Sequence, residues 1–267
     1  MTPFCRTDIE SALTQIKSAL PRIRASDHHL QCSECPIRHR AVCSRADEDE
    51  LAELNAIKFY KTHKAGETIA LRGESLPIVA SVVAGTAVLE KSIEDGRTQM
   101  VGLLLPSDFI GRPGRDGVAY DVTAVSDVTL CCFHRKPFED LMARTPHIRE
   151  RLLEMTLDEL DAARDWMLLL GRKTAREKIA SLLTLLVKRT RNPEGAALGT
   201  SERIELPISR EAMANFLGLT IETVSRQMTA LRKDGVIGLD GSRGVTIPDL
   251  GLLLAEAGED DDGGMIV

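Results

Sequence analysis

Aromatic side chains are scarce in this sequence: they make up 3% of its 267 residues, with a single tryptophan. Proteins that bind single-stranded nucleic acid stack its bases on aromatic rings, so this composition argues against that class. The formal net charge of −6 argues against a protein that coats nucleic acid through charge alone, although it leaves room for a local basic face. No apolar run approaches the roughly 20 residues of a membrane span, and the N-terminus lacks the apolar core of a signal peptide. We therefore expect a cytoplasmic protein without a membrane partner.

Recognisable catalytic patterns are missing as well. No nucleophile with a neighbouring base and no pair of carboxylates stands out. The glycine-containing stretch 111–114 is too short, and too interrupted by proline, to be a phosphate-binding loop. These absences predict that the protein is not an enzyme.

The composition is that of a globular protein, with 43% hydrophobic and 28% charged residues. The length gives room for one large or two modest domains, each with its own core. The sequence holds six cysteines. Structural disulfides are rare in a reducing cytoplasm, so metal or redox chemistry is the better explanation for these thiols.

Three of the cysteines form a C-x2-C-x7-C pattern at Cys32, Cys35 and Cys43. Thiolates this close in sequence can share one inorganic centre, either a zinc ion or an iron–sulfur cluster, and both need a fourth ligand. The spacing alone favours zinc, because C-x2-C is common in closed zinc sites of four cysteines. The candidates for the fourth ligand are Cys131, Cys132, Cys5 and His39.

Between about residues 59 and 133, short β-type runs alternate with glycine and proline turns. The pair Asp95-Gly96 suits a hairpin turn, because such turns need a positive φ. Many short strands at this spacing predict an antiparallel roll or sandwich, preceded by a short helix at 47–57. The candidate strands are 68–71, 78–83, 87–92, 99–105 and 122–133.

Residues 145–171 are predicted to form one continuous helix. Thr145 suits the cap and Pro146 the first helical position, and no other proline or glycine follows before Gly171. One face carries apolar residues at coiled-coil spacing, and we expect this seam to pair with a second copy of the chain: Leu153, Leu157, Leu160, Ala163, Met167 and Leu170. A second apolar face is left to pack on the helix's own domain.

Residues 208–233 carry the pattern of a helix-turn-helix. Ser209 and Thr220 can each cap a short helix, and Gly218 supplies the turn between them. The second helix of this motif enters the major groove with its N-terminus first. Arginine, glutamate, serine and threonine there can read base edges, so the candidate DNA-contacting residues are Thr220, Glu222, Thr223, Ser225 and Arg226. A hairpin expected at 236–247 makes the motif a winged helix. A second class of protein with clustered cysteines, the iron–sulfur electron carriers, would not need such a motif, so it argues against that class.

The stretch Ile221-Glu-Thr-Val-Ser-Arg226 closely resembles the recognition helix of the CRP/FNR family of bacterial transcription regulators. The order of elements agrees with that family over nearly the whole chain. Residues 35–43, 103–111 and 167–177 are most similar to the FNR branch, and in particular to the FnrL-type regulators of alphaproteobacteria. This resemblance implies an α+β fold: an antiparallel β-roll like that of cyclic-nucleotide-binding domains, a long dimerisation helix and a C-terminal winged helix-turn-helix.

The resemblance also implies where these parts begin and end. The expected divisions are a cysteine-bearing segment at 1–50, the β-roll sensor domain at 51–144, the dimerisation helix at 145–171, the DNA-binding domain at 172–250 and an acidic tail at 251–267.

On the same resemblance, the cysteines hold a [4Fe-4S] cluster and not zinc. The implied ligands are Cys32, Cys35, Cys43 and Cys131. Neighbouring residues of a strand point to opposite faces, so only one of the two adjacent cysteines can serve. The position of Lys136-Pro-Phe138 favours Cys131, and Cys132 would then pack as a small core residue.

The resemblance further implies a homodimer that binds two-fold symmetric sites in double-stranded DNA and works with RNA polymerase. Glu222, Ser225 and Arg226 match the residues with which the family contacts bases. A cyclic nucleotide is not expected as the effector, because Asp121 stands where the anionic ligand would need a cation.

We therefore expect a transcription regulator that senses low oxygen. The cluster would tie the cysteine-bearing segment to the strand that leads into the dimer helix, and so control pairing and DNA binding. The alternative is a regulator of the same fold with a structural zinc, or no metal, at the cysteine site, responding to another signal.

Overall fold

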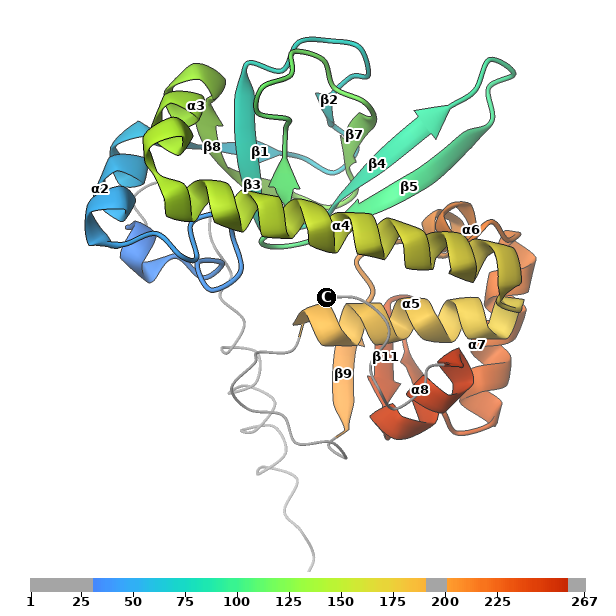
Figure 1. Cartoon of the computed structure of the whole chain (residues 1–267). Helices are drawn as coiled ribbons and strands as arrows, with labels where there is room; N and C mark the ends of the chain where they lie inside the picture. Colours follow the sequence, from blue (N-terminus) through green and yellow to red (C-terminus); the bar gives the residue numbers. More distant parts are fainter. Residues whose placement is uncertain (1–30, 191–200, 259–267) are drawn as a thin grey trace, which may run out of the picture.

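The computed structural model describes residues 31–190 and 201–258. The long helix α4 (Pro146–Arg172) runs between a β-rich unit and a helical unit (Figure 1). The cysteine-bearing segment lies near the N-terminal end of α4, and the helical unit lies beside its C-terminal half (Figure 1). The predicted α+β architecture is thereby confirmed. Cys5, the loop 191–200 and the acidic residues after Gly258 lie outside the described residues.

The cysteine-bearing segment starts with the short 3-10 helix η1 (Cys32–Glu34) and continues through tight turns. Its buried apolar side chains pack on the β-rich unit and hold these turns in place: Ile37, Ala41, Val42 and Ala46. Helix α2 (Glu48–Ile57) follows, close to its predicted position. It begins with a capping box, in which Asp47 and Glu50 each accept a hydrogen bond from the other's backbone N–H.

The β-rich unit is a roll of two four-stranded antiparallel sheets. The strand orders are β1-β8-β3-β6 and β2-β7-β4-β5, and buried apolar side chains fill the space between the sheets. The strands are β1 (Lys58–His63), β2 (Thr68–Ala70), β3 (Ile78–Ala84), β4 (Ala87–Ser92), β5 (Thr98–Leu104), β6 (Phe109–Ile110), β7 (Asp121–Ala124) and β8 (Val128–His134).

The roll differs from the sequence prediction in several places. Strands β1 and β6 are not among the predicted strands. The single run expected at 122–133 is two strands in different sheets, because the chain turns a corner at 125–127. The Thr86 N–H donates to Ser126 Oγ, and the Val125 N–H donates to the Thr86 carbonyl oxygen. These two bonds hold that corner against the turn after β3. A helix that the sequence did not predict, α3 (Arg135–Arg144), connects β8 to α4.

Helix α4 has 27 residues, so the prediction of one continuous helix is confirmed. Pro146 occupies the first turn, where its missing N–H is not needed. Thr145 stands at the N-cap position, but its side chain accepts no capping hydrogen bond from the described residues.

The helical unit begins with α5 (Ala175–Thr190), whose capping box joins Thr174 and Glu177. A three-stranded sheet of order β10-β11-β9 and three further helices complete it. Their bounds are β9 (Glu202–Glu205), α6 (Arg210–Leu217), α7 (Ile221–Lys233), β10 (Gly238–Asp240), β11 (Gly244–Ile247) and α8 (Leu250–Ala257).

Helix α8 corrects the predicted end of the DNA-binding domain. The acidic tail was expected from residue 251, but Leu253 and Ala257 are buried in the core of the helical unit. Asp249 caps the helix by accepting a hydrogen bond from the Gly251 N–H. Arg176 of α5 forms an ion pair with Glu256, so the helix belongs to the domain. A tail can therefore begin only after Gly258.

Among the helices that the structure describes, none is both long and apolar enough to cross a lipid bilayer.

Candidate metal centre and nucleic-acid interface

Four cysteine side chains converge on one cavity, which we call the thiol pocket. Cys32, Cys35 and Cys43 reach it from the cysteine-bearing segment, and Cys131 reaches it from β8. The remaining wall is formed by Ile37, Ala41, Val42, Leu54, Tyr60, Ser81 and Phe133. The structure thus brings together all four predicted ligands, although the fourth follows the third by 88 positions in the sequence.

The two adjacent cysteines of β8 face opposite sides of their sheet. Cys131 packs with the cysteine-bearing segment, whereas Cys132 is fully buried inside the roll. Burial raises the pKa of Cys132 to about 12, so it remains a thiol at neutral pH. His39, another candidate ligand, is exposed and is not part of the pocket wall.

The thiols of the pocket influence each other's ionisation. Burial, followed by the neighbouring Cys35 and Cys32 thiolates, raises the pKa of Cys43 to about 11. Burial and three nearby cysteines raise the pKa of Cys131 well above its ordinary value. Cys43 and Cys131 therefore stay protonated at neutral pH unless a positively charged group binds beside them.

Sequence reasoning missed the residues that pair with Cys131 across the sheet. Tyr60 of β1 and Ser81 of β3 stand directly opposite Cys131, one on each side. Lys58, at the start of β1, places its Nζ 3.6 Å from the Cys32 sulfur. The alternation of β1 puts Lys58 and Tyr60 on one face, but only the strand register shows which face that is.

The spread of the sulfurs bears on the kind of centre that the pocket can hold. Within residues 31–190 and 201–258, no three of these sulfur atoms lie within 4.8 Å of one another. A single zinc ion with Zn–S bonds of about 2.3 Å would require a tighter group. Cys32, Cys35, Cys43 and Cys131 would hold a [4Fe-4S] cluster as its four thiolate ligands, and their wider spread would suit it. The all-thiolate donor set suits both centres chemically.

Helix α4 is attached to the ligand-bearing turns by polar contacts. Arg151 Nη2 donates to the carbonyl oxygen of Arg40, which lies between the second and third cysteines, over 2.8 Å. Arg151 Nη1 also lies 3.2 Å from Glu154 Oε2, and Arg45 pairs with Glu154 over 2.7 Å. The arginine is mostly buried, with 19% of its side chain exposed.

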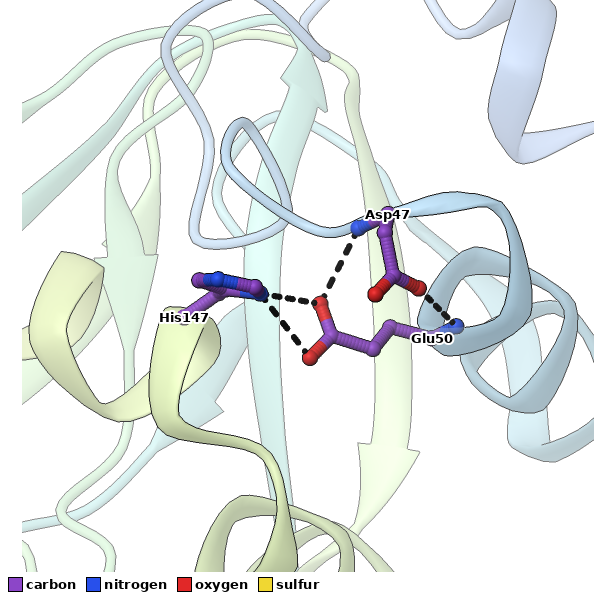
Figure 2. Close-up of side chains that lie close together, drawn as sticks. All are labelled: Asp47, Glu50 and His147. Atoms are coloured by element: carbon purple, nitrogen blue, oxygen red, sulfur yellow. Dashed lines mark hydrogen bonds and ion pairs between the residues drawn. The ribbon is translucent and has the colours of Figure 1, made fainter.

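A second attachment joins the first turn of α4 to the capping box of α2. His147 Nδ1 lies 3.1 Å from both carboxylate oxygens of Glu50 (Figure 2). The same carboxylate accepts the Asp47 N–H, and Asp47 accepts the Glu50 N–H. These three side chains approach closely enough to suggest a cation site, but their carboxylates already serve the helix cap. We interpret the group as a link between α2 and α4.

The predicted seam of α4 lies largely on the outer side of the chain. The leucines at 153, 157 and 160 have exposed fractions of 59%, 52% and 45%, Met167 has 74%, and Ala163 is exposed. Leu170 departs from this pattern, because it is half-buried against the core of the helical unit. On the opposite face Ile148 and Leu169 are fully buried, as expected of the helix's inward side.

The inward face of α4 also contacts the helix-turn-helix. The Trp166 ring stacks on Phe216 of α6, with ring centroids 4.1 Å apart and an interplanar angle of 24°. The roll reaches the same helix through Gln99, whose Nε2 donates to the Asn215 carbonyl over 2.8 Å. Asp108 of the roll forms an ion pair with Arg189 of α5. The helical unit is therefore held in place by contacts with both α4 and the roll.

The helix-turn-helix forms as the sequence predicted. Ser209 Oγ accepts from the Ala212 N–H at the start of α6, and Gly218 ends that helix with a φ of 62°. Thr220 Oγ1 accepts from the Thr223 N–H at the start of α7, and the two threonine hydroxyls lie 3.1 Å apart. The threonines therefore serve first as the cap that orients α7.

The side chains that α7 offers to a ligand lie on its first two turns. Glu222, Ser225 and Arg226 are exposed, while Val224 and Met228 are buried beneath them. The amide of its own residue and the Thr220 hydroxyl lower the pKa of Glu222, so it is ionised at neutral pH. No ion pair joins Glu222 to Arg226 in the described part of the chain, which leaves both side chains available to DNA. The hairpin β10–β11 forms the predicted wing.

Two family models match the chain. A Crp-like helix-turn-helix domain matches residues 177–256, and a cyclic nucleotide-binding domain matches residues 60–145. The chain is 60% identical over 242 residues to the transcriptional activator protein FnrL of Cereibacter sphaeroides, which covers 89% of this chain and 96% of that protein. It is 38% identical over 226 residues to the nitrogen fixation regulation protein FixK of Bradyrhizobium diazoefficiens, covering 84% and 92%.

A solved structure of a regulator has the same fold as this chain. The structure of FixK2 from Bradyrhizobium japonicum superposes with a TM-score of 0.67 at 31% identity, covering 74% of this chain and 96% of that one. Two domain models, close relatives and a matching fold agree with the winged helix and the roll described above. The chain therefore belongs to the CRP/FNR family of DNA-binding transcription regulators, which are not enzymes, and is of the FNR type.

Proposed function

We propose that this protein senses low oxygen through a [4Fe-4S] cluster held by Cys32, Cys35, Cys43 and Cys131, and as a homodimer activates transcription from two-fold symmetric promoter sites. The observation that carries the proposal is the thiol pocket, where Cys131 turns out of β8 toward the three cysteines of the N-terminal segment. FnrL, the relative at 60% identity, is named a transcriptional activator.

The pocket favours a cluster over a zinc ion. Its sulfurs are spread more widely than a single ion prefers, and its wall is mostly apolar. When bound, the cluster supplies a redox centre that oxygen can oxidise, whereas zinc has no redox chemistry. The chain itself supplies four thiolates, a shielding wall of aliphatic residues, and the Lys58 ammonium 3.6 Å from the Cys32 sulfur.

The signal passes from the pocket to the dimer helix through backbone and ion-pair contacts. The position of the Arg40 carbonyl depends on the turns that carry Cys35 and Cys43, and Arg151 of α4 is bonded to that carbonyl. With the four thiolates joined to one centre, these turns are fixed and so is the contact. Release of the thiolates frees the turns, and α4 loses one of its supports.

The other end of the mechanism is DNA recognition. The outward seam of α4 pairs two protomers, and pairing sets the distance between their two α7 helices at about one helical turn of DNA. Arg226 donates to guanine, Glu222 accepts from cytosine, and Ser225 contacts a neighbouring base pair. Thr220 and Thr223 hold the start of α7 at the groove. Activation then requires contact with RNA polymerase.

The roll does not need a cyclic nucleotide in this mechanism. Asp121, in place of a cation, accepts a hydrogen bond from the Arg72 N–H over 2.8 Å. Its carboxylate would repel the phosphate of such a ligand. The match to the cyclic nucleotide-binding domain therefore describes the fold of the roll.

The experiment is purification without air, followed by assays for iron, sulfide and zinc, an absorption spectrum, and operator binding before and after exposure to air. About four irons and four sulfides per chain, with an absorption band that bleaches in air and weaker operator binding afterwards, support the proposal. Stoichiometric zinc, with operator binding unchanged by air, would support the alternative of a structural zinc site.

A further inference from the structure

Ser81 is a buried hydroxyl group that faces the thiol pocket. It lies in β3 directly opposite Cys131 of β8, and its exposed fraction is 3%. Its Oγ is fully buried and has no hydrogen-bond partner among the residues that the structure describes. Ser81 is also part of the pocket wall, together with all four cysteines.

An unpaired buried hydroxyl needs an explanation, because buried polar groups nearly always find a partner. The preceding residue of the same strand, Ala80, belongs to the opposite face of the sheet and packs inside the roll, so of the two only Ser81 faces the cysteines. The unpaired group also points into a cavity where sulfur atoms, which accept hydrogen bonds, are gathered. Elsewhere at the pocket, Lys58 Nζ already lies 3.6 Å from the Cys32 sulfur.

We infer that Ser81 donates an O–H···S hydrogen bond to the sulfur-ligated centre of the thiol pocket, and that this bond makes the centre harder to oxidise. The inference rests on the proposed function, since it assigns a further residue to the same site. The acceptor is the Cys131 thiolate or a sulfide next to it.

The effect on oxidation follows from the charge of the acceptor. A hydrogen bond draws electron density from sulfur and is stronger when the centre carries more negative charge. It therefore favours the reduced form over the oxidised form, as hydrogen bonds to sulfur generally do in iron–sulfur proteins. Removing the hydroxyl should make the centre easier to oxidise without removing a ligand.

The test compares the parent with Ser81→Ala, both reconstituted without air. We expect the variant to retain about four irons per chain and to bleach roughly fivefold faster at a fixed oxygen concentration, which corresponds to about 1 kcal/mol for one hydrogen bond. Resonance Raman spectra provide a second readout. The iron–sulfur stretching bands of the parent should shift on transfer to heavy water, and this shift should be smaller in Ser81→Ala.

Thr184→Val is the matched control. Thr184 of α5 is also fully buried with no hydrogen-bond partner in the described residues, but it lies in the core of the helical unit. This variant should bleach like the parent. Equal bleaching rates and equal Raman bands for parent and Ser81→Ala, with four irons in both, would overturn this inference alone. Zinc in place of iron in the parent would overturn the proposed function as well.

Discussion

Replacing Arg151 with methionine tests whether the ligand-bearing turns control α4. The substitution keeps most of the aliphatic stem and removes the donor to the Arg40 carbonyl, which lies 2.8 Å from Nη2. A hydrogen bond from a charged donor contributes about 1.5–3 kcal/mol. Because 19% of the Arg151 side chain is exposed, we take the lower part of that range, about 1.5–2 kcal/mol. The corresponding factor is roughly 10- to 30-fold.

The quantity to measure is the coupling between cluster binding and dimerisation. Sedimentation equilibrium without air gives the dimer dissociation constant of the metal-free and of the cluster-loaded protein. The first constant divided by the second is the coupling, which equals one when the cluster has no effect on dimerisation. We expect this ratio to fall roughly 10- to 30-fold in Arg151→Met, to no less than unity, because α4 no longer responds to the position of the turns.

A second arginine of the same helix provides the control. Arg164 is 65% exposed, and among residues 31–190 and 201–258 it pairs with Asp161, three residues earlier. Arg164→Met should leave the ratio unchanged. A ratio for Arg151→Met equal to that of the parent would refute the idea that this contact carries the signal.

Three further predictions concern the seam, the recognition helix and the buried thiols. Leu157→Ala removes a side chain that is 52% exposed in one protomer. Its loss from both protomers should weaken dimerisation by about 2 kcal/mol, or roughly 30-fold, measured by sedimentation. The control Leu71→Ala, which removes a side chain that is 46% exposed on the roll, should leave dimerisation unchanged. Arg226→Met should lose about 1–3 kcal/mol per half-site only on operators that keep the contacted guanine, measured by competition with base-substituted operators. The metal-free protein should lose free energy of unfolding as pH rises, because the pKa values of Cys43 and Cys132, about 11 and about 12, exceed the ordinary thiol value of 9.0.

The direction of the pH effect follows from the protonated form being the one that the fold buries. The stabilisation from neutral thiols is fully present below pH 9 and is lost between pH 9 and about 12. Urea unfolding at pH 8 to 11 measures it, and a flat profile would contradict the burial of these groups. For Arg226→Met, an equal loss on every base variant would contradict a base contact and indicate a phosphate contact.

Strand alternation was enough to predict that Cys131 and Cys132 face opposite sides, because that rule needs only adjacent residues. The same rule could not predict which residues lie opposite Cys131 on the neighbouring strands. Tyr60 and Ser81 reach the pocket only through the pairing of β8 with β1 and β3, and pairing over such sequence distances depends on the whole roll. The contact between Arg151 and a loop carbonyl is unpredictable for the same reason.

The sequence prediction was wrong at the end of the DNA-binding domain and at the last position of the seam. The sequence prediction ends the DNA-binding domain at residue 250, whereas α8, capped by Asp249, continues it to Ala257. The last seam position, Leu170, turns toward the helical unit. A coiled-coil repeat of 3.5 residues and a straight helix of 3.6 residues per turn drift apart by about 20° per heptad, so the far end of a 27-residue helix leaves the seam.

The central claim is that the centre held in the thiol pocket links the cysteine-bearing segment to the roll and thereby controls DNA binding. The adjacent cysteines of β8 test this claim most directly. Operator affinity is measured without air for Cys131→Ser and for Cys132→Ala, the latter removing the cysteine that points into the roll. We expect Cys131→Ser to bind at least roughly tenfold more weakly than the parent, and Cys132→Ala to bind like it. If Cys131→Ser occupies the operator as tightly as the parent, the pocket does not control DNA binding and the account is wrong.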